Sequence, residues 1–218
     1  MTSQSTEDLI AQLTTAPAAV KPLPRPILRA LAFLAAAFAL VAAVVAFHGV
    51  RHNLDIIMAL PWRQVEFAAS IITGVLAAIA AFHLAVPGRS AFWALLPAPA
   101  ALLWLGSLGA GCWSDFVRLG PDGLALGTSW ACLKAITLTS IPMGALLFWM
   151  LRFAGPVTSL PVALFGTLAV AALSAAGLTL YHHLEAAILV LVWHIGSITL
   201  VTLATVASRR VIFRAIGP

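Results

Sequence analysis

Long apolar runs with almost no charged residues recur along the whole sequence, and they restrict the possible fold more than any other feature. The first run carries no charge from Ala30 to Phe47. A helix that crosses a bilayer needs about 20 apolar residues. Six runs approach that length, at about Ile27–Phe47, Phe67–Val86, Ser90–Ala110, Ser129–Leu151, Leu160–Tyr181 and Ala186–Ser208. With 62% hydrophobic and only 9% charged residues, the chain has more apolar surface than a soluble domain of 218 residues can bury.

The runs are predicted to be helices, because every backbone polar group inside a bilayer must find a partner within the protein. They show no alternation of apolar and polar residues, so a β-barrel is disfavoured. The sequence therefore predicts an all-α, polytopic membrane protein with six transmembrane helices. Residues 1–26 would form a short cytoplasmic segment with its own helix, and residues 27–218 the six-helix transmembrane domain.

Lysine and arginine residues between the runs predict the orientation, since they are enriched in cytoplasmic loops. If the N-terminus is inside, eight of them lie inside and three outside. The inside set is Lys21, Arg25, Arg29, Arg89, Arg152, Arg209, Arg210 and Arg214, and the outside set is Arg51, Arg63 and Arg118. Both termini are therefore predicted to be cytoplasmic. The pI of about 10.3 is explained by these scattered flanking residues, and no motif for direct nucleic-acid binding accompanies it.

The N-terminal stretch "STEDLIAQL" predicts a short helix that begins after Ser5. Leu9, Ile10 and Leu13 would form one apolar stripe along it. A Pro-rich tether, "TTAPAAVKPLPRP", joins this helix to the first span. Because a helix of about eight residues is marginal alone in water, it is expected to order on a partner. A disordered tail, or a helix that lies on the membrane surface, is the alternative.

Both cysteines and four of the six histidines are predicted at the outer face. His48 and His52 are four residues apart, so one helical face could present both. Cys112 would lie in a loop, Cys132 about one turn into the fourth span, and His182 and His183 with Glu185 in the turn before the sixth. Thiolate and imidazole together favour Zn or Cu(I), and a thiol also supports oxidation chemistry. The alternative is that the cysteines only pack and the histidines only cap helices.

His194 is predicted near the middle of the membrane, about 16 Å along a helix from the outer turn, where it must be neutral or paired. A hydrogen bond from His194 to a neighbouring span would explain a polar residue at this depth. A haem ligand in a membrane enzyme, or part of a small transporter or metal carrier, is a competing interpretation. Mid-membrane carboxylates, a phosphate-binding glycine loop and a nucleophile elbow are all absent from the sequence, so no enzymatic activity is predicted.

Several motifs, in order along nearly the whole chain, resemble those of the NrsF-type membrane anti-sigma factors. They are "DLIAQL" (Asp8–Leu13), "AVKPLPRP" (Ala19–Pro26), "SWAC" (Ser129–Cys132), "IPMGALLFWMLRFAGP" (Ile141–Pro156), and "HHLE" before the last span followed by "WH". This family consists of six-span bacterial inner-membrane proteins with a short cytoplasmic N-terminal segment. The resemblance implies the same fold and location for this chain.

The resemblance also implies a mechanism, in which the N-terminal segment holds an extracytoplasmic-function (ECF) sigma factor at the membrane. Asp8, Leu9, Ile10 and Leu13 would make the contact, with Lys21 and Arg25 facing an acidic surface. Two envelope-side cysteines would respond to metals or oxidants and release the sigma factor. The first corresponds to Cys132, but His183 stands at the second position.

That replacement leaves three alternatives for the sensor. Cys132 and His183 could form a mixed site that binds a transient metal ion, with His182 or Glu185 assisting; Cys112 could supply the second thiol; or the chain senses no thiol chemistry. A resident cofactor is not expected. Apart from the sigma factor, membrane lipid is the expected partner.

Overall fold

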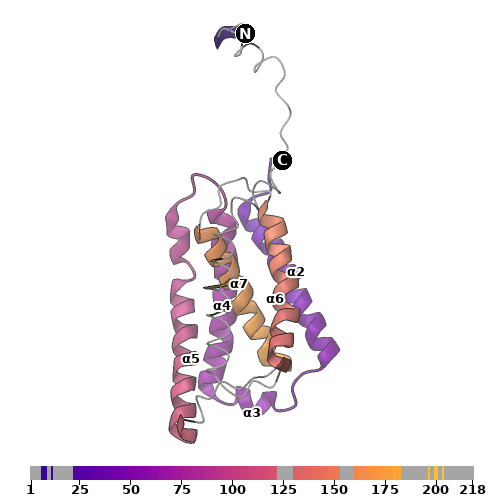
Figure 1. The fold of residues 1–218 in the computed structure, drawn as a ribbon, viewed down its shortest axis with the longest axis vertical. Coiled ribbons are helices and arrows are strands. Elements are labelled where there is room, and N and C mark those ends of the chain that lie inside the picture. The colour runs from indigo at the N-terminus through magenta and orange to yellow at the C-terminus, as the bar shows by residue number, and fades with distance from the viewer. Residues whose placement is uncertain are drawn as a thin grey trace.

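The computed structural model describes residues 6–8, 11, 22–121, 130–152, 160–182, 196, 199–200 and 203. Within these ranges every regular element is helical (Figure 1). The elements are α2 (Pro26–His48), α3 (Leu54–Met58), α4 (Pro61–Leu84), the 3₁₀ helix η1 (Ala91–Leu95), α5 (Ala98–Leu119), α6 (Trp130–Leu151) and α7 (Leu160–Tyr181). The predicted all-α class is therefore confirmed.

Five helical segments of the described chain are long and apolar enough to cross a membrane. They are Pro26–His48, Pro61–Leu84, Ala91–Ser114, Lys134–Leu151 and Leu160–Tyr181. These correspond to the first five predicted spans. The predicted sixth span, Ala186–Ser208, lies almost wholly outside the described residues. At the N-terminus residues 6–8 and 11 are helical and exposed, whereas the predicted contact residues Leu9, Ile10, Leu13 and Lys21 fall outside the description.

Two predicted boundaries are wrong. The second helix begins at Pro61, six residues before the predicted Phe67, because proline suits the first helical turn and an Arg63–Glu66 ion pair lets the charged residues remain helical. The third span is interrupted at Pro97, where η1 gives way to α5, and α5 then continues to Leu119, beyond the predicted end at Ala110.

The helix α7 forms the centre of the bundle, between α4 and α6 (Figure 1). All ten residues from Ala169 to Leu178 are buried. Since successive residues point about 100° apart around a helix, neighbours must cover α7 on every side over this length. Helices α2, α4 and α6 contact α7 along the backbone, and Trp104 and Leu108 of α5 pack on Ala172 and Ala175.

Glycines lie at three of the close helix contacts with α7. A Cβ on Gly74 of α4 would lie 2.6 Å from the Leu173 side chain, one on Gly166 would lie 3.0 Å from Leu147 of α6, and one on Gly177 would lie 3.2 Å from Val41 of α2. Small residues allow close helix approach inside membranes, where burial from water does not drive helices together. The close approach of α7 to its neighbours therefore depends on glycine, which has no side chain, at these three positions.

Gly74→Ala is expected to lower the thermal unfolding midpoint of the purified protein by several degrees. The new methyl group would meet not only the Leu173 side chain but also its backbone nitrogen, at 3.2 Å, so α7 itself must shift. Overpacking of this kind costs about 1–3 kcal/mol. The matched control is Gly106→Ala in α5, which meets nothing within 4 Å; equal midpoints for the two variants would contradict this packing.

Candidate functional site

Helix α2 runs from one end of the bundle to the other (Figure 1). We call the end where α2 begins, near Arg25, the tail end. The opposite end, where α2 finishes, carries α3 and is called the α3 end. At this α3 end α2, α6 and α7 pack together through Val44, Ala135, Ile136, Leu178 and Tyr181. We refer to this group and the polar residues around it as the α3-end junction.

Tyr181 connects α7 to α6 and α2 at the α3-end junction. Its hydroxyl donates a hydrogen bond to the backbone carbonyl of Ala135 at 3.1 Å. The His48 ring lies 5.3 Å from the Tyr181 ring, measured between centroids, and its Nδ1 is 3.1 Å from the carbonyl oxygen of Val44. Ala135 is about one turn from Cys132, so Tyr181 fixes the beginning of α6 where that cysteine lies.

Arg51 holds the end of α7 from the loop between α2 and α3. Its backbone N–H donates to the carbonyl of Leu180 at 2.9 Å, and its Nη1 donates to the carbonyl of His182 at 3.2 Å. Its Nε donates to Oδ1 of Asn53 at 2.8 Å. The residue is only 7% exposed. The last carbonyls of a helix lack helical partners and carry partial negative charge, so a buried guanidinium stabilises this terminus.

The structure places some, but not all, of the predicted sensor residues. His182 directly follows α7 and its carbonyl accepts the Arg51 hydrogen bond. The backbone of Cys132 lies in the first turn of α6, whereas its side chain, His183, Glu185 and His194 lie outside the description. Among the described residues, no group of three or more His, Cys, Asp or Glu side chains could hold a metal ion.

Two placements at this end were predicted wrongly. Cys112 belongs to helix α5, where it is half-buried, and not to a loop. His48 and His52 do not share a helical face, because α2 ends at His48 and Gly49 has a φ of 81°. That left-handed conformation suits glycine and interrupts the helix.

Arg29 makes the corresponding connection at the tail end. It lies one turn inside α2, is 7% exposed, and its Nη2 donates a hydrogen bond to the carbonyl of Met150, near the last residue of α6. Its guanidinium also lies 5.3 Å from the centre of the Phe82 ring in α4. One side chain therefore joins the beginning of α2 to the ends of α6 and α4.

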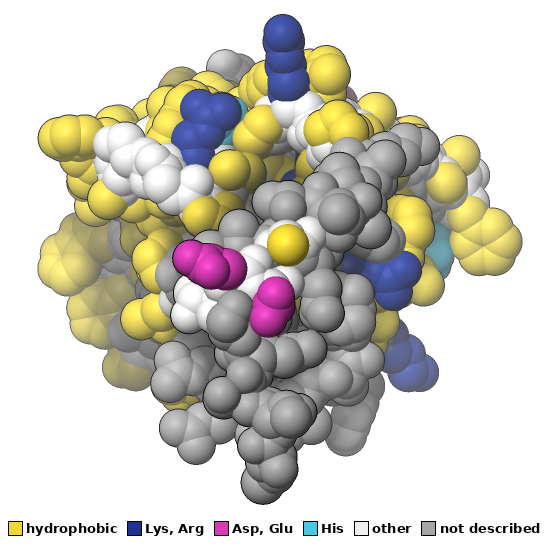
Figure 2. Space-filling model, turned by 90° about the horizontal axis from the view of Figure 1, so that it is seen from above, with side chains coloured by type: hydrophobic (Ala, Val, Ile, Leu, Met, Phe, Trp, Pro, Cys, Tyr) yellow, Lys and Arg dark blue, Asp and Glu magenta, His cyan; other side chains and the backbone are white. Residues whose placement is uncertain are grey.

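Other aromatic and basic side chains pair near helix ends at the tail end of the bundle. The rings of His83 and Trp93 stack with centroids 3.7 Å apart, and Arg152 lies 5.6 Å from the centre of the Trp149 ring. Figure 2 views this end and shows Lys and Arg side chains among mainly hydrophobic ones. Such a mixture suits the interfacial zone of a membrane.

Sequence reasoning treated Arg29 and Arg51 only as charges that indicate orientation. Arg29 nevertheless carried a recognisable signal, because it lies inside the predicted span Ile27–Phe47, where an unpaired charge is costly. Arg51 had no comparable signal, since the carbonyls that it contacts at the end of α7 are about 130 residues away in the sequence.

These observations define a class, an all-helical protein with at least five helices able to span a membrane and with polar connections at both ends of the bundle. Residues 13–214 match the family described as NrsF, negative regulator of sigma F, and the chain belongs to that family. This confirms the resemblance noted in the sequence. The comparisons found no match among curated proteins and none among solved structures. Family membership supports an anti-sigma role with a sigma factor as the partner, and regulators of this kind are typically not enzymes.

Proposed function

We propose that this protein holds an ECF-type sigma factor at the bacterial inner membrane and releases it when a metal or oxidant acts on the envelope side. The observation that carries the proposal is the family match over residues 13–214. The several membrane-compatible helices are consistent with sequestration at a membrane.

The N-terminal segment is the proposed sigma-binding element. Its contact residues would be Asp8, Leu9, Ile10 and Leu13, assisted by Lys21 and Arg25. Residues 6–8 and 11 are helical and exposed, as an amphipathic helix that docks in a partner's groove requires. The tether between this helix and α2 contains three prolines, at residues 17, 22 and 24, which favour an extended spacer.

In the proposed orientation, the tail end of the bundle faces the cytoplasm and the α3 end faces the envelope. Basic residues support this arrangement, because Arg25, Arg89 and Arg152 lie in segments at the tail end. With a sixth span at Ala186–Ser208, both chain termini would be cytoplasmic.

Helix α6 is the proposed route from sensor to tail. Cys132 lies in its first turn, close to the carbonyl of Ala135 that accepts the Tyr181 hydrogen bond. Near its other end, the carbonyl of Met150 accepts the Arg29 hydrogen bond from α2. A displacement of α6 would therefore change a polar contact with the helix that continues into the sigma-binding segment.

The size of the required effect favours a metal or redox signal. Changing a two-state ratio from 1:99 to 99:1 needs about 5.5 kcal/mol of differential binding. Titration of one exposed histidine supplies only about 1.36 kcal/mol if its pKa differs by one between the two states. Binding of a metal ion by Cys132, His183 and either His182 or Glu185 can supply more, and this mixed site is the sensor we favour.

The function is tested by expressing the full chain together with candidate sigma factors and separating membrane from soluble fractions. The cognate sigma factor is expected in the membrane fraction only when the protein is present, and a peptide of residues 1–26 should bind it in a pull-down. Recovery of every ECF sigma factor in the soluble fraction, with the protein correctly inserted, would contradict the proposal.

Cys132→Ser is expected to reduce the metal- or oxidant-induced rise in sigma-dependent transcription by tenfold or more, because serine binds soft metals poorly. His183→Ala should give the same result. Cys112→Ser is the control and should retain full induction. A reporter gene with a sigma-dependent promoter measures all three, and normal induction in Cys132→Ser would remove this cysteine from the mechanism.

A further inference from the structure

A short turn and the 3₁₀ helix η1 connect α4 to α5 at the tail end of the bundle (Figure 1). The stacked rings of His83 and Trp93, with only 16° between their planes, fix η1 against the end of α4. The hydroxyl oxygen of Ser90 accepts a hydrogen bond from the backbone N–H of Phe92 at 3.2 Å and caps η1. The connection is therefore a defined element with fixed contacts.

Arg89 lies in the turn before η1 and has an exposed side chain. Its backbone N–H donates to the carbonyl of Val86 at 3.3 Å, which holds the turn. The residue is two positions before the membrane-compatible segment Ala91–Ser114. A basic residue directly before a span lies at the depth of the lipid headgroups, so its guanidinium can reach a phosphate there.

An apolar strip follows Arg89 along η1. A 3₁₀ helix has about three residues per turn, so Phe92 and Leu95 lie on the same face of η1. Their side chains are 79% and 62% exposed. Farther along the chain, Leu102 in α5 is 71% exposed as well. A cation at headgroup depth followed by exposed apolar side chains matches the polarity of a phospholipid, with its phosphate at the surface and its acyl chains deeper.

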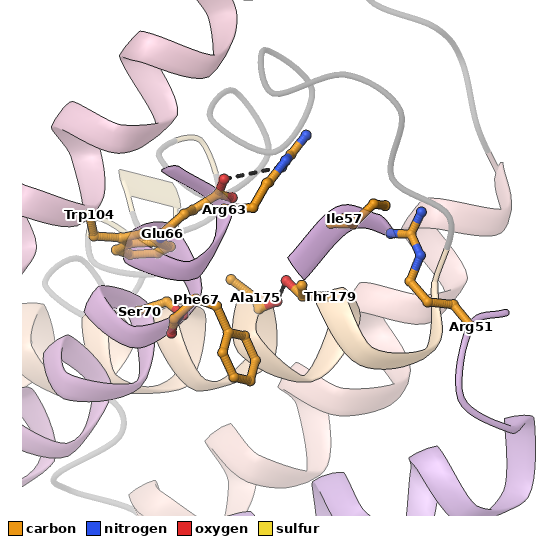
Figure 3. Close-up of a pocket in the computed structure, with 9 residues that line it drawn as sticks. All are labelled: Arg51, Ile57, Arg63, Glu66, Phe67, Ser70, Trp104, Ala175 and Thr179. Carbon is orange, nitrogen blue, oxygen red and sulfur yellow. Dashed lines mark hydrogen bonds and ion pairs between the residues drawn. The ribbon is translucent and has the colours of Figure 1, made fainter. Parts of the chain in front are cut away.

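The charge at the tail end favours an anionic lipid over a zwitterionic one. No aspartate or glutamate occurs in the described segments at this end, which are residues 22–30, 80–100, 146–152 and 160–164. At the α3 end, in contrast, Glu66 pairs with Arg63 at 3.1 Å (Figure 3), and α3 carries Asp55. An ammonium headgroup would therefore meet no carboxylate in these tail-end segments and would be repelled by Arg89.

We propose that Arg89, Phe92 and Leu95 form a binding site for an anionic phospholipid such as phosphatidylglycerol. The guanidinium donates charged hydrogen bonds to the phosphate, and the exposed face of η1 aligns an acyl chain beside it. Contact with the apolar strip does not select one lipid over another, because acyl chains are present everywhere in the bilayer. The headgroup provides the selectivity, and the strip provides the position.

The test is thermal unfolding of the purified full chain in mild detergent, titrated with lipids at constant ionic strength. Dioleoyl phosphatidylglycerol is the anionic probe, and dioleoyl phosphatidylcholine is the control with the same acyl chains. A ligand that binds the folded state raises the unfolding midpoint in a saturable way. We expect phosphatidylglycerol to raise it by about 2–6 °C more than phosphatidylcholine does. Inorganic phosphate and glycerol phosphate should leave it unchanged, because they lack acyl chains.

Variants of Arg89 test the charge. Arg89→Gln is expected to weaken the apparent affinity for phosphatidylglycerol by about fivefold or more, and Arg89→Lys should stay within about twofold of the wild type, because lysine keeps the charge. Both variants should fold, since the side chain is exposed and the backbone holds the turn.

The matched control is Lys134→Gln. It removes an exposed cation from the beginning of α6, at the α3 end. The length of the bundle separates this position from Arg89, so salt screens its effect at the tail end. The affinity for phosphatidylglycerol should therefore change by less than about twofold.

Each outcome decides the proposal. A saturable effect of phosphatidylglycerol that weakens in Arg89→Gln and returns in Arg89→Lys supports it. Equal midpoints with the two lipids would overturn it, and an equal effect of glycerol phosphate would identify a soluble anion as the ligand instead. Unchanged affinity in Arg89→Gln, or an equal loss in Lys134→Gln, would show that no site exists at this turn. The inference does not depend on the anti-sigma role, so failure of sigma-factor binding would leave these measurements unaffected.

Discussion

Replacing Leu9 and Leu13 together with aspartate is expected to abolish binding of the sigma factor. Burial of a leucine side chain contributes about 1.5–3 kcal/mol, so two such losses weaken binding by about 100-fold or more. In cells, transcription from the sigma-dependent promoter should become constitutive. In vitro, the double variant of a peptide of residues 1–26 should fail to retain the sigma factor in a pull-down.

The control for this experiment is Ala11→Gln. Position 11 lies on the opposite side of the predicted helix from Leu9 and Leu13, and it is exposed. Glutamine keeps a similar helix propensity, so binding should change by less than about threefold. Both full-length variants should be recovered in membranes at wild-type levels. If the aspartate variant bound as tightly as the wild type, the apolar stripe would not be the contact.

Arg29→Gln is expected to raise sigma-dependent transcription in the absence of any inducer. The hydrogen bond from the Arg29 guanidinium to the carbonyl of Met150 joins α2 to α6. A charged hydrogen bond of this kind contributes about 1.5–3 kcal/mol. If the releasing state lacks this contact, its loss shifts the equilibrium toward release by about 10- to 150-fold. A promoter reporter measures the basal level, and membrane fractionation measures how much sigma factor stays bound.

The control is Arg152→Gln, which removes an exposed arginine from the same end of the bundle. Its guanidinium lies over the Trp149 ring, where such a contact contributes about 0.5–1 kcal/mol, so the basal level should change by less than about fivefold. Protein levels must be compared, because a variant that does not accumulate would also free the sigma factor. Unchanged basal transcription in a stable Arg29→Gln protein would exclude this contact from the release step.

The sequence predicted the fold well where hydrophobicity decides the structure. Leu160–Tyr181 was predicted as a span and is observed as α7 with the same limits, since apolar length and helical backbone satisfaction determine such a segment. Errors arose where polar residues continue a helix. The stretch from Pro61 to Glu66 reads as a polar loop, yet the Arg63–Glu66 pair lets α4 extend through it.

The candidate site was less accessible from the sequence. The turn that starts with His182 could be found, because polar residues there interrupt an apolar pattern. The contacts of Arg51 with His182 and of Tyr181 with α6 could not be predicted. They are hydrogen bonds between segments that are distant in the sequence.

The central position of α7 has a consequence for how the protein is assembled. The described helices that pack on it, α2, α4, α5 and α6, precede it in the chain. These neighbours have already been synthesised when α7 is inserted into the bilayer. Helix α7 can therefore pack against them, and not against lipid, as soon as it is inserted. Its buried stretch Ala169–Leu178 is half alanine, with one glycine and one serine, and such small side chains make few contacts with acyl chains. Truncation before Leu160 would thus leave a set of inserted helices with no common core to gather around.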